Sequence, residues 1–134
     1  MPGCLRVTAF ALAILAVLAA APVATASQPS GLACLQTAQS TAALNDCVGA
    51  AYTKARKQLA AAYAKLLARK GFSAADRAGL AAAERKWLQF ESVDCSWAEV
   101  LNKGGTLAAA DRGICLVRDT TDRTQALEDY AATG

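Results

Sequence analysis

Apolar positions recur every three or four residues over most of the chain after residue 40, which is the spacing of an amphipathic helix. Ser40 or Thr41 supplies an N-cap, and a basic segment followed by Gly71 supplies an end, so the pattern predicts a first helix over residues 41–70. The apolar stripe of this helix consists of Leu44, Val48, Ala51, Tyr52, Ala55, Leu59, Ala62, Tyr63 and Leu66.

A second helix is predicted to begin at Ser73. Asp76 follows three residues later, a close variant of the capping box that starts many helices. Gly104 and Gly105 end the helix because glycine readily leaves the helical conformation. The expected inward positions are Leu80, Ala83, Trp87, Phe90 or Glu91, Asp94 or Cys95, Ala98 and Leu101.

Thr106 is the expected N-cap of a third helix that runs to about residue 131, with Gly113 as a weak point inside it. Its expected inward positions are Ile114, Val117, Thr121 and Leu127. Proline is absent after Pro29, and a short helical arm is expected within residues 32–39. The predicted fold class is all-α, a disulfide-stapled antiparallel bundle of three long helices with a short N-terminal helical arm.

The start of the chain has the plan of a secretory signal peptide. Arg6 precedes an apolar run over residues 7–21, and a small-residue motif predicts cleavage after Ala26. A retained membrane anchor fits less well, because the run is shorter than the roughly 20 residues of a spanning helix. The expected organisation is a signal peptide over 1–26 and one helical domain over 27–134, periplasmic or secreted and without a membrane segment after cleavage.

The charge balance is close to even. The chain has 14 Lys and Arg against 11 Asp and Glu, a formal net charge of +3 that falls by one when Arg6 leaves with the signal peptide. Such a balance gives no electrostatic reason to expect a nucleic acid or an anionic membrane surface as a partner.

Disulfides are predicted by the even number of cysteines in a small exported chain. The four that remain after cleavage are Cys34, Cys47, Cys95 and Cys115. A hairpin that turns at Gly105 brings Cys95 and Cys115 face to face, because the glycine lies midway between them. A turn near residue 40 likewise pairs Cys34 with Cys47, which a straight helix would hold roughly 20 Å apart.

Catalytic chemistry has little support in the sequence. The chain has no histidine, the commonest general base and metal ligand, and no CxxC pair, so neither a metal site nor a cofactor is expected. Glu84, Glu91 and Asp94 resemble paired carboxylates for glycoside hydrolysis. Charged residues on a bundle helix usually face water, however, and we expect that placement and no enzymatic activity.

Three aromatic residues, Trp87, Phe90 and Trp97, share one side of the predicted second helix because they are three and seven residues apart. The simplest explanation is that they fill the core of an alanine-rich bundle. The alternative is that Phe90 or Trp97 contributes to a patch that binds a partner.

The segment Lys103-Gly104-Gly105 also has two explanations. As a structural element, it ends a helix and makes a tight connection in which glycine supplies a positive φ. As a binding element, it is a narrow exposed tip that carries a cation and can enter an acidic enzyme cleft.

Several short motifs follow one another in a recognisable order over nearly the whole chain after the signal peptide. They are Cys34, LNDC at 44–47, LAAAYAKL at 59–66, LAAAERKWLQFESVDC at 80–95, Gly104-Gly105, Cys115 and Arg123-Thr124. In this order they resemble the family of the lysozyme inhibitor LprI, in its N-terminal-domain type. The chain departs from the family pattern at Ala60, Glu84, Glu91 and Asp119, which replace asparagine, glutamine, arginine and leucine.

The resemblance implies an exported, non-enzymatic helical protein that acts as a lysozyme inhibitor. In this hypothesis lysozyme is the partner, and the inhibitor occludes the enzyme's cleft. The alternative hypothesis is a periplasmic adaptor or scaffolding module that binds another envelope protein, with an aromatic patch around Phe90 or Trp97 as its docking surface.

Overall fold

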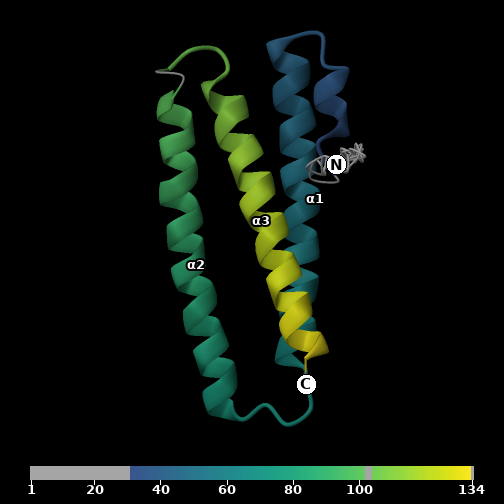
Figure 1. Ribbon diagram of the computed structural model, residues 1–134, viewed down its shortest axis with the longest axis vertical. Helices are drawn as coiled ribbons and strands as arrows, with labels where there is room; N and C mark the ends of the chain where they lie inside the picture. The colour runs from purple at the N-terminus through teal and green to yellow at the C-terminus, as the bar shows by residue number, and fades with distance from the viewer. Residues whose placement is uncertain (1–30, 102–103, 134) are drawn as a thin grey trace, which may run out of the picture.

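Three long antiparallel helices make up most of the part of the protein that the structure describes, as the sequence predicts (Figure 1). The computed structural model describes residues 31–101 and 104–133. A short 3-10 helix, η1, spans Ala33–Gln36 and precedes α1 (Thr41–Leu67), α2 (Ala74–Leu101) and α3 (Ala108–Ala132). In Figure 1 α3 lies between the other two helices, and it packs extensively against both of them. The fold class is therefore all-α.

α1 begins where its cap predicts and ends earlier than its composition predicts. Ser40 Oγ accepts the Ala43 N–H at 3.1 Å and caps the first turn. The helix ends at Leu67 instead of residue 70, because Arg77 Nε of α2 donates a hydrogen bond to the Leu67 carbonyl at 3.2 Å. An end-of-helix carbonyl is thereby satisfied from outside. Gly71, with φ +87°, reverses the chain after the helix end.

α2 starts with the predicted capping box. The Ser73 N–H donates to Asp76 Oδ2 at 2.8 Å, and the Asp76 N–H donates back to Ser73 Oγ at 3.1 Å. The Ser73 hydroxyl also donates to Asp76 Oδ2. This bond is the main cause that lowers the pKa of the exposed Asp76 carboxyl, and the bond from the Ser73 N–H adds to the effect.

α3 begins at Ala108 instead of next to Thr106, and the predicted Thr106 cap is wrong. Leu107 occupies the N-cap position, and no side chain makes a capping hydrogen bond there. A backbone turn takes its place, in which the Ala108 N–H donates to the Gly105 carbonyl at 3.0 Å.

The apolar core lies mainly between α1 and α3 and forms two clusters along their length. One contains Leu32, Val48, Ala51 and Val117, and the other contains Leu59, Ala62, Leu66 and Leu127. The predicted α1 stripe is confirmed, because its central members are buried and Leu44, Tyr52 and Tyr63 are half-buried. Among the predicted inward residues of α3, Val117 and Leu127 are buried at 1% and 0% exposure.

Two disulfides fasten the helices at the same end of the molecule, in the pairing that the hairpin geometry predicts. Cys34–Cys47 joins η1 to α1 with a Cα–Cα distance of 5.9 Å. Cys95–Cys115 joins α2 to α3 with a Cα–Cα distance of 5.4 Å. Among the described residues, no helix combines the length and apolar character that crossing a membrane requires.

Candidate binding surface

α2 carries an apolar face that points away from the other helices. Steps of four and three residues connect its members, which are all solvent-exposed. We call this face the outer stripe, and it consists of Ala75, Gly79, Ala82, Lys86, Phe90, Val93, Trp97 and Val100. Its large members keep 53% to 73% of their surface exposed. Contiguous exposed apolar residues of this size are typical of an interaction site.

The prediction that Phe90 and Trp97 fill the core is wrong. Their exposed fractions are 57% and 64%. Trp87, by contrast, is half-buried against the core cluster that contains Leu66 and Leu127. The predicted inward positions Ala83 and Leu101 are exposed as well. α2 is therefore rotated about its axis relative to the orientation that its apolar residues predict.

Polar side chains on the opposite face of α2 explain this rotation. Buried Glu91 accepts a 2.6 Å hydrogen bond from Thr120 Oγ1, and Glu84 Oε2 lies 3.0 Å from Arg123 Nε. Arg112 adds contacts to Ser96 at 3.0 Å and to Glu99 at 3.2 Å. The expectation that Glu84 faces water is wrong, and of the two candidates for one inward position, Phe90 and Glu91, the structure buries Glu91. Each carboxyl meets a polar partner on α3.

Glu91 is the most perturbed carboxyl at this helix contact. Burial is the main cause that raises its pKa, and the carboxylates of Asp119 and Glu84 add to the effect. The Thr120 hydrogen bond and the Arg56 guanidinium act in the opposite direction. Arg56 Nη1 lies 3.8 Å from Glu91 Oε2 and makes no hydrogen bond. The carboxyl is thus held between α2 and α3 as part of the contact between the two helices.

The carboxylates of Asp94 and Asp119 surround the Cys95–Cys115 disulfide. Their oxygens and the two sulfurs lie within 4.8 Å of one another, a spacing that suits a metal ion. The sulfurs are bonded to each other, however, and a disulfide sulfur lacks the thiolate charge that makes cysteine a ligand. Arg118 pairs with Asp94 at 3.6 Å and with Asp119 at 3.0 Å. The arrangement is therefore an ion-pair cluster around a disulfide.

The connection between α2 and α3 forms an exposed tip. We call it the tip surface, and it consists of Leu101, Gly104, Gly105 and Leu107. Leu101 and Leu107 keep 69% and 45% of their surface exposed, and Gly104 has the positive φ, +75°, that this turn requires. Lys103 lies outside the described residues.

Trp97 lies one helical turn from Leu101, so the outer stripe runs directly into the tip surface. Phe90, Trp97 and the two glycines, which the sequence offered as separate candidates, therefore belong to one continuous side of the α2–α3 hairpin. Val93 and Val100 also belong to this side of the hairpin. Their three- and four-residue spacing from Phe90 and Trp97 is the feature of the sequence that indicates a shared face.

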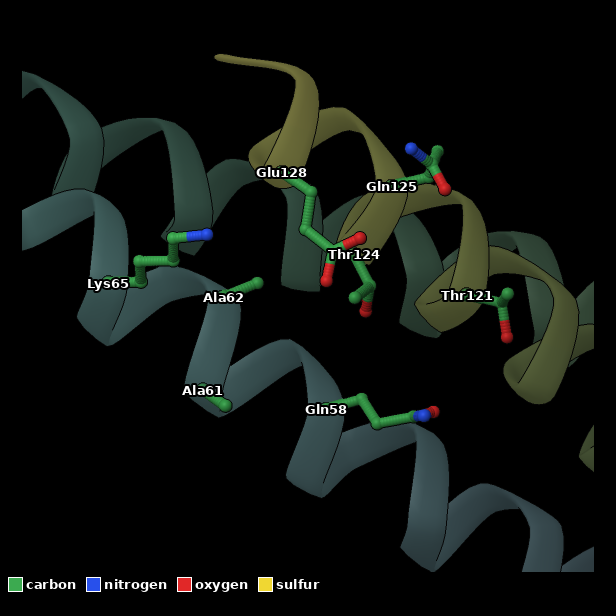
Figure 2. A pocket seen from close by; sticks show the side chains of 8 residues that line it. All are labelled: Gln58, Ala61, Ala62, Lys65, Thr121, Thr124, Gln125 and Glu128. Carbon is green, nitrogen blue, oxygen red and sulfur yellow. The ribbon is translucent and has the colours of Figure 1, made fainter. Parts of the chain in front are cut away.

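A shallow groove of about 350 Å³ lies between α1 and α3 (Figure 2). Most of the residues that line it are of polar type: Gln58, Ala61, Ala62, Lys65, Thr121, Thr124, Gln125 and Glu128. The two threonine hydroxyls donate to carbonyls of their own helix at 2.7 and 2.8 Å. The backbone of α3 therefore engages both hydroxyl protons.

No curated protein and no solved structure matches this chain. The sequence pattern of one family, described as lysozyme inhibitor LprI, matches residues 33–127. The match begins just before Cys34 and ends at the buried Leu127, so it spans η1, α1, α2 and all of α3 except its last turns. The chain therefore belongs to the LprI family of lysozyme inhibitors.

Proposed function

We propose that the protein is exported as residues 27–134 and inhibits a lysozyme by covering its cleft with the tip surface, without chemistry of its own. Membership of an inhibitor family carries this proposal. The two disulfides support export, since such bonds persist in oxidising compartments. The exposed Leu101 and Leu107 at the tip supply apolar surface for such a contact.

The tip combines three properties that suit insertion. Leu101 and Leu107 offer apolar contact, and the glycines keep the end narrow. The Cys95–Cys115 disulfide ties α2 to α3 below the tip and limits the conformational entropy that binding must remove. Lys103 adds a cation, which would lie against the paired carboxylates of a lysozyme cleft.

Net charge does not help the encounter if the target lysozyme is basic. The chain is itself positive, so long-range electrostatic attraction is absent and local contacts at the tip must supply the affinity. Replacing the cation of the tip therefore tests the proposal more sharply than varying the ionic strength.

A cell-wall turbidity assay with a panel of animal and bacterial lysozymes tests the function. We expect saturable inhibition by the oxidised protein and its disappearance on reduction of the disulfides. Lys103→Glu should weaken inhibition at least about tenfold, or 1.4 kcal/mol. Lys57→Glu makes the same charge change at an exposed position of α1 and should leave inhibition unchanged. Full inhibition by the Lys103 variant would rule out insertion of the tip.

A second function is favoured by the exposure of Phe90 and Trp97, which suits an envelope adaptor that docks on another protein. The two functions differ in the surface they use. Phe90→Ser with Trp97→Ser would abolish binding by an adaptor, whereas an inhibitor acting through the tip would keep its potency. Lack of inhibition of every lysozyme at large molar excess would favour the adaptor.

A further inference from the structure

We propose that the outer stripe is covered by the outer stripe of a second copy, in an antiparallel pair of α2 helices related by a two-fold axis. The axis passes near residue 88. This interface uses one surface of each copy twice, as expected for a symmetric dimer. It would cover the largest group of exposed apolar side chains on the described part of the protein.

The order of residue sizes along the stripe carries the proposal. The first part, Ala75, Gly79 and Ala82, is small, and the last part, Val93, Trp97 and Val100, is large. Antiparallel pairing about residue 88 sets each large residue of the last part against a small residue of the first part. The facing pairs are Trp97 with Gly79, Val93 with Ala82, Val100 with Ala75, and Phe90 with Lys86. A parallel pair would instead set Trp97 against Trp97 and glycine against glycine.

A hollow beside Gly79 strengthens this register. It measures about 400 Å³ and is lined chiefly by apolar and aromatic residues: Leu66, Phe72, Ala75, Gly79, Leu80 and Tyr130. Arg69, whose guanidinium lies 5.6 Å from the centre of the Phe72 ring, and Asp76 complete the lining. In the proposed pair, Trp97 of the second copy reaches Gly79 and the edge of this hollow, where an indole finds aromatic and cationic neighbours.

Charge at the centre of the interface is also accommodated. Lys86 is the one charged member of the outer stripe, and the register places it against Phe90 of the other copy. An ammonium over a phenyl ring is an attractive contact, and the long side chain keeps its charged end in water.

The dimensions suit a stable dimer. The stripe runs about 38 Å from residue 75 to residue 100 at 1.5 Å per residue. The exposed parts of Phe90 and Trp97 in two copies amount to about 500 Å², a large share of the roughly 1,200 Å² of a small stable interface. Antiparallel pairing places the two α2–α3 turns at opposite ends of the dimer.

Sedimentation velocity of the exported, oxidised protein over about 1–100 μM measures the association. We expect a concentration-dependent dimer. Gly79→Lys should raise its dissociation constant at least about tenfold, because a side chain then fills the place of Trp97 of the second copy. The variant should fold, since a Cβ at Gly79 meets no atom within 4 Å and lysine favours a helix.

Gly49→Lys is the matched control. Gly49 is also an exposed helical glycine with no atom within 4 Å of an added Cβ, and it lies on α1. This variant should dimerise as the unaltered protein does.

A size exchange tests the register itself. Gly79→Leu alone should weaken the dimer, and adding Trp97→Ala should restore it, because the larger residue then faces the smaller one. A protein that remains monomeric at every concentration would overturn the proposal and leave the stripe to a different protein partner. A dimer that Gly79→Lys does not weaken would overturn it as well.

Discussion

Thr120 Oγ1 on α3 donates a 2.6 Å hydrogen bond to Glu91 Oε1 on α2, and both side chains are buried. An interhelical bond between a hydroxyl and a carboxyl satisfies two polar groups that the contact removes from water. The orientation of α2 about its axis depends on it, because turning the apolar outer stripe inward would carry Glu91 out of reach of Thr120.

Glu91→Gln tests the consequence of this burial for pH dependence. Burial raises the pKa of Glu91 above its ordinary value near 4.5, so the folded state holds a proton that the unfolded chain releases. The contribution of Glu91 to stability is complete below pH 4.5 and is lost as pH rises through the raised pKa. We expect the stability of Glu91→Gln relative to the unaltered protein to increase with pH over this range.

Urea unfolding at several pH values measures this difference. A difference between Glu91→Gln and the unaltered protein that stays constant with pH would contradict the buried, proton-holding carboxyl.

Arg123→Ala should destabilise the protein by about 3 kcal/mol, because it leaves the Glu84 carboxylate without its partner at a site where both side chains are only 14% exposed. The guanidinium also lies 5.9 Å from the centre of the Trp87 ring, and the substitution removes this cation–π interaction as well. Chemical denaturation gives the value. Arg112→Ala should cost under about 1 kcal/mol, because its pair with Glu99 is more exposed.

Gly113→Ala should destabilise the protein by about 1–3 kcal/mol although alanine favours a helix. A Cβ at residue 113 would overlap Cγ1 of the buried Val48, whose β-branched side chain has little freedom to move. Gly49→Ala, where space is free, should stabilise by about 0.5–1 kcal/mol. Thermal unfolding of both variants measures these two changes in stability. A Gly113→Ala variant that is more stable than the unaltered protein would refute the close approach of α1 and α3.

The two disulfides should differ in their rate of reduction. Cys95 and Cys115 are buried at 0% and 4% exposure, whereas Cys34 is exposed and Cys47 half-buried. A reductant therefore reaches Cys34–Cys47 first, because exchange requires access to a sulfur. Timed alkylation followed by peptide mass spectrometry identifies the order. Release of Cys95 and Cys115 before the other pair would contradict the observed burial.

The orientation of α2 shows where sequence reasoning failed. The apolar residues of this helix form two faces, and their spacing alone left Phe90 and Glu91 as alternatives for one inward position and placed Leu101 inward as well. The structure instead turns Glu84 and Glu91 inward. Those carboxylates stay in a helix contact because Arg123 and Thr120 of α3 meet them there, and no pattern within residues 74–101 reveals the partners.

The sequence by itself determined the three helices, the caps at Ser40 and Ser73, the α1 stripe and the cysteine pairing. These properties depend on short-range spacing, side-chain hydrogen bonds to the nearby backbone and the position of turns. Only the tertiary structure decided the early end of α1, the buried polar contacts and the exposure of the outer stripe. Each of these depends on groups far apart in the chain, whose mutual satisfaction outweighs the preference of a single apolar residue for burial.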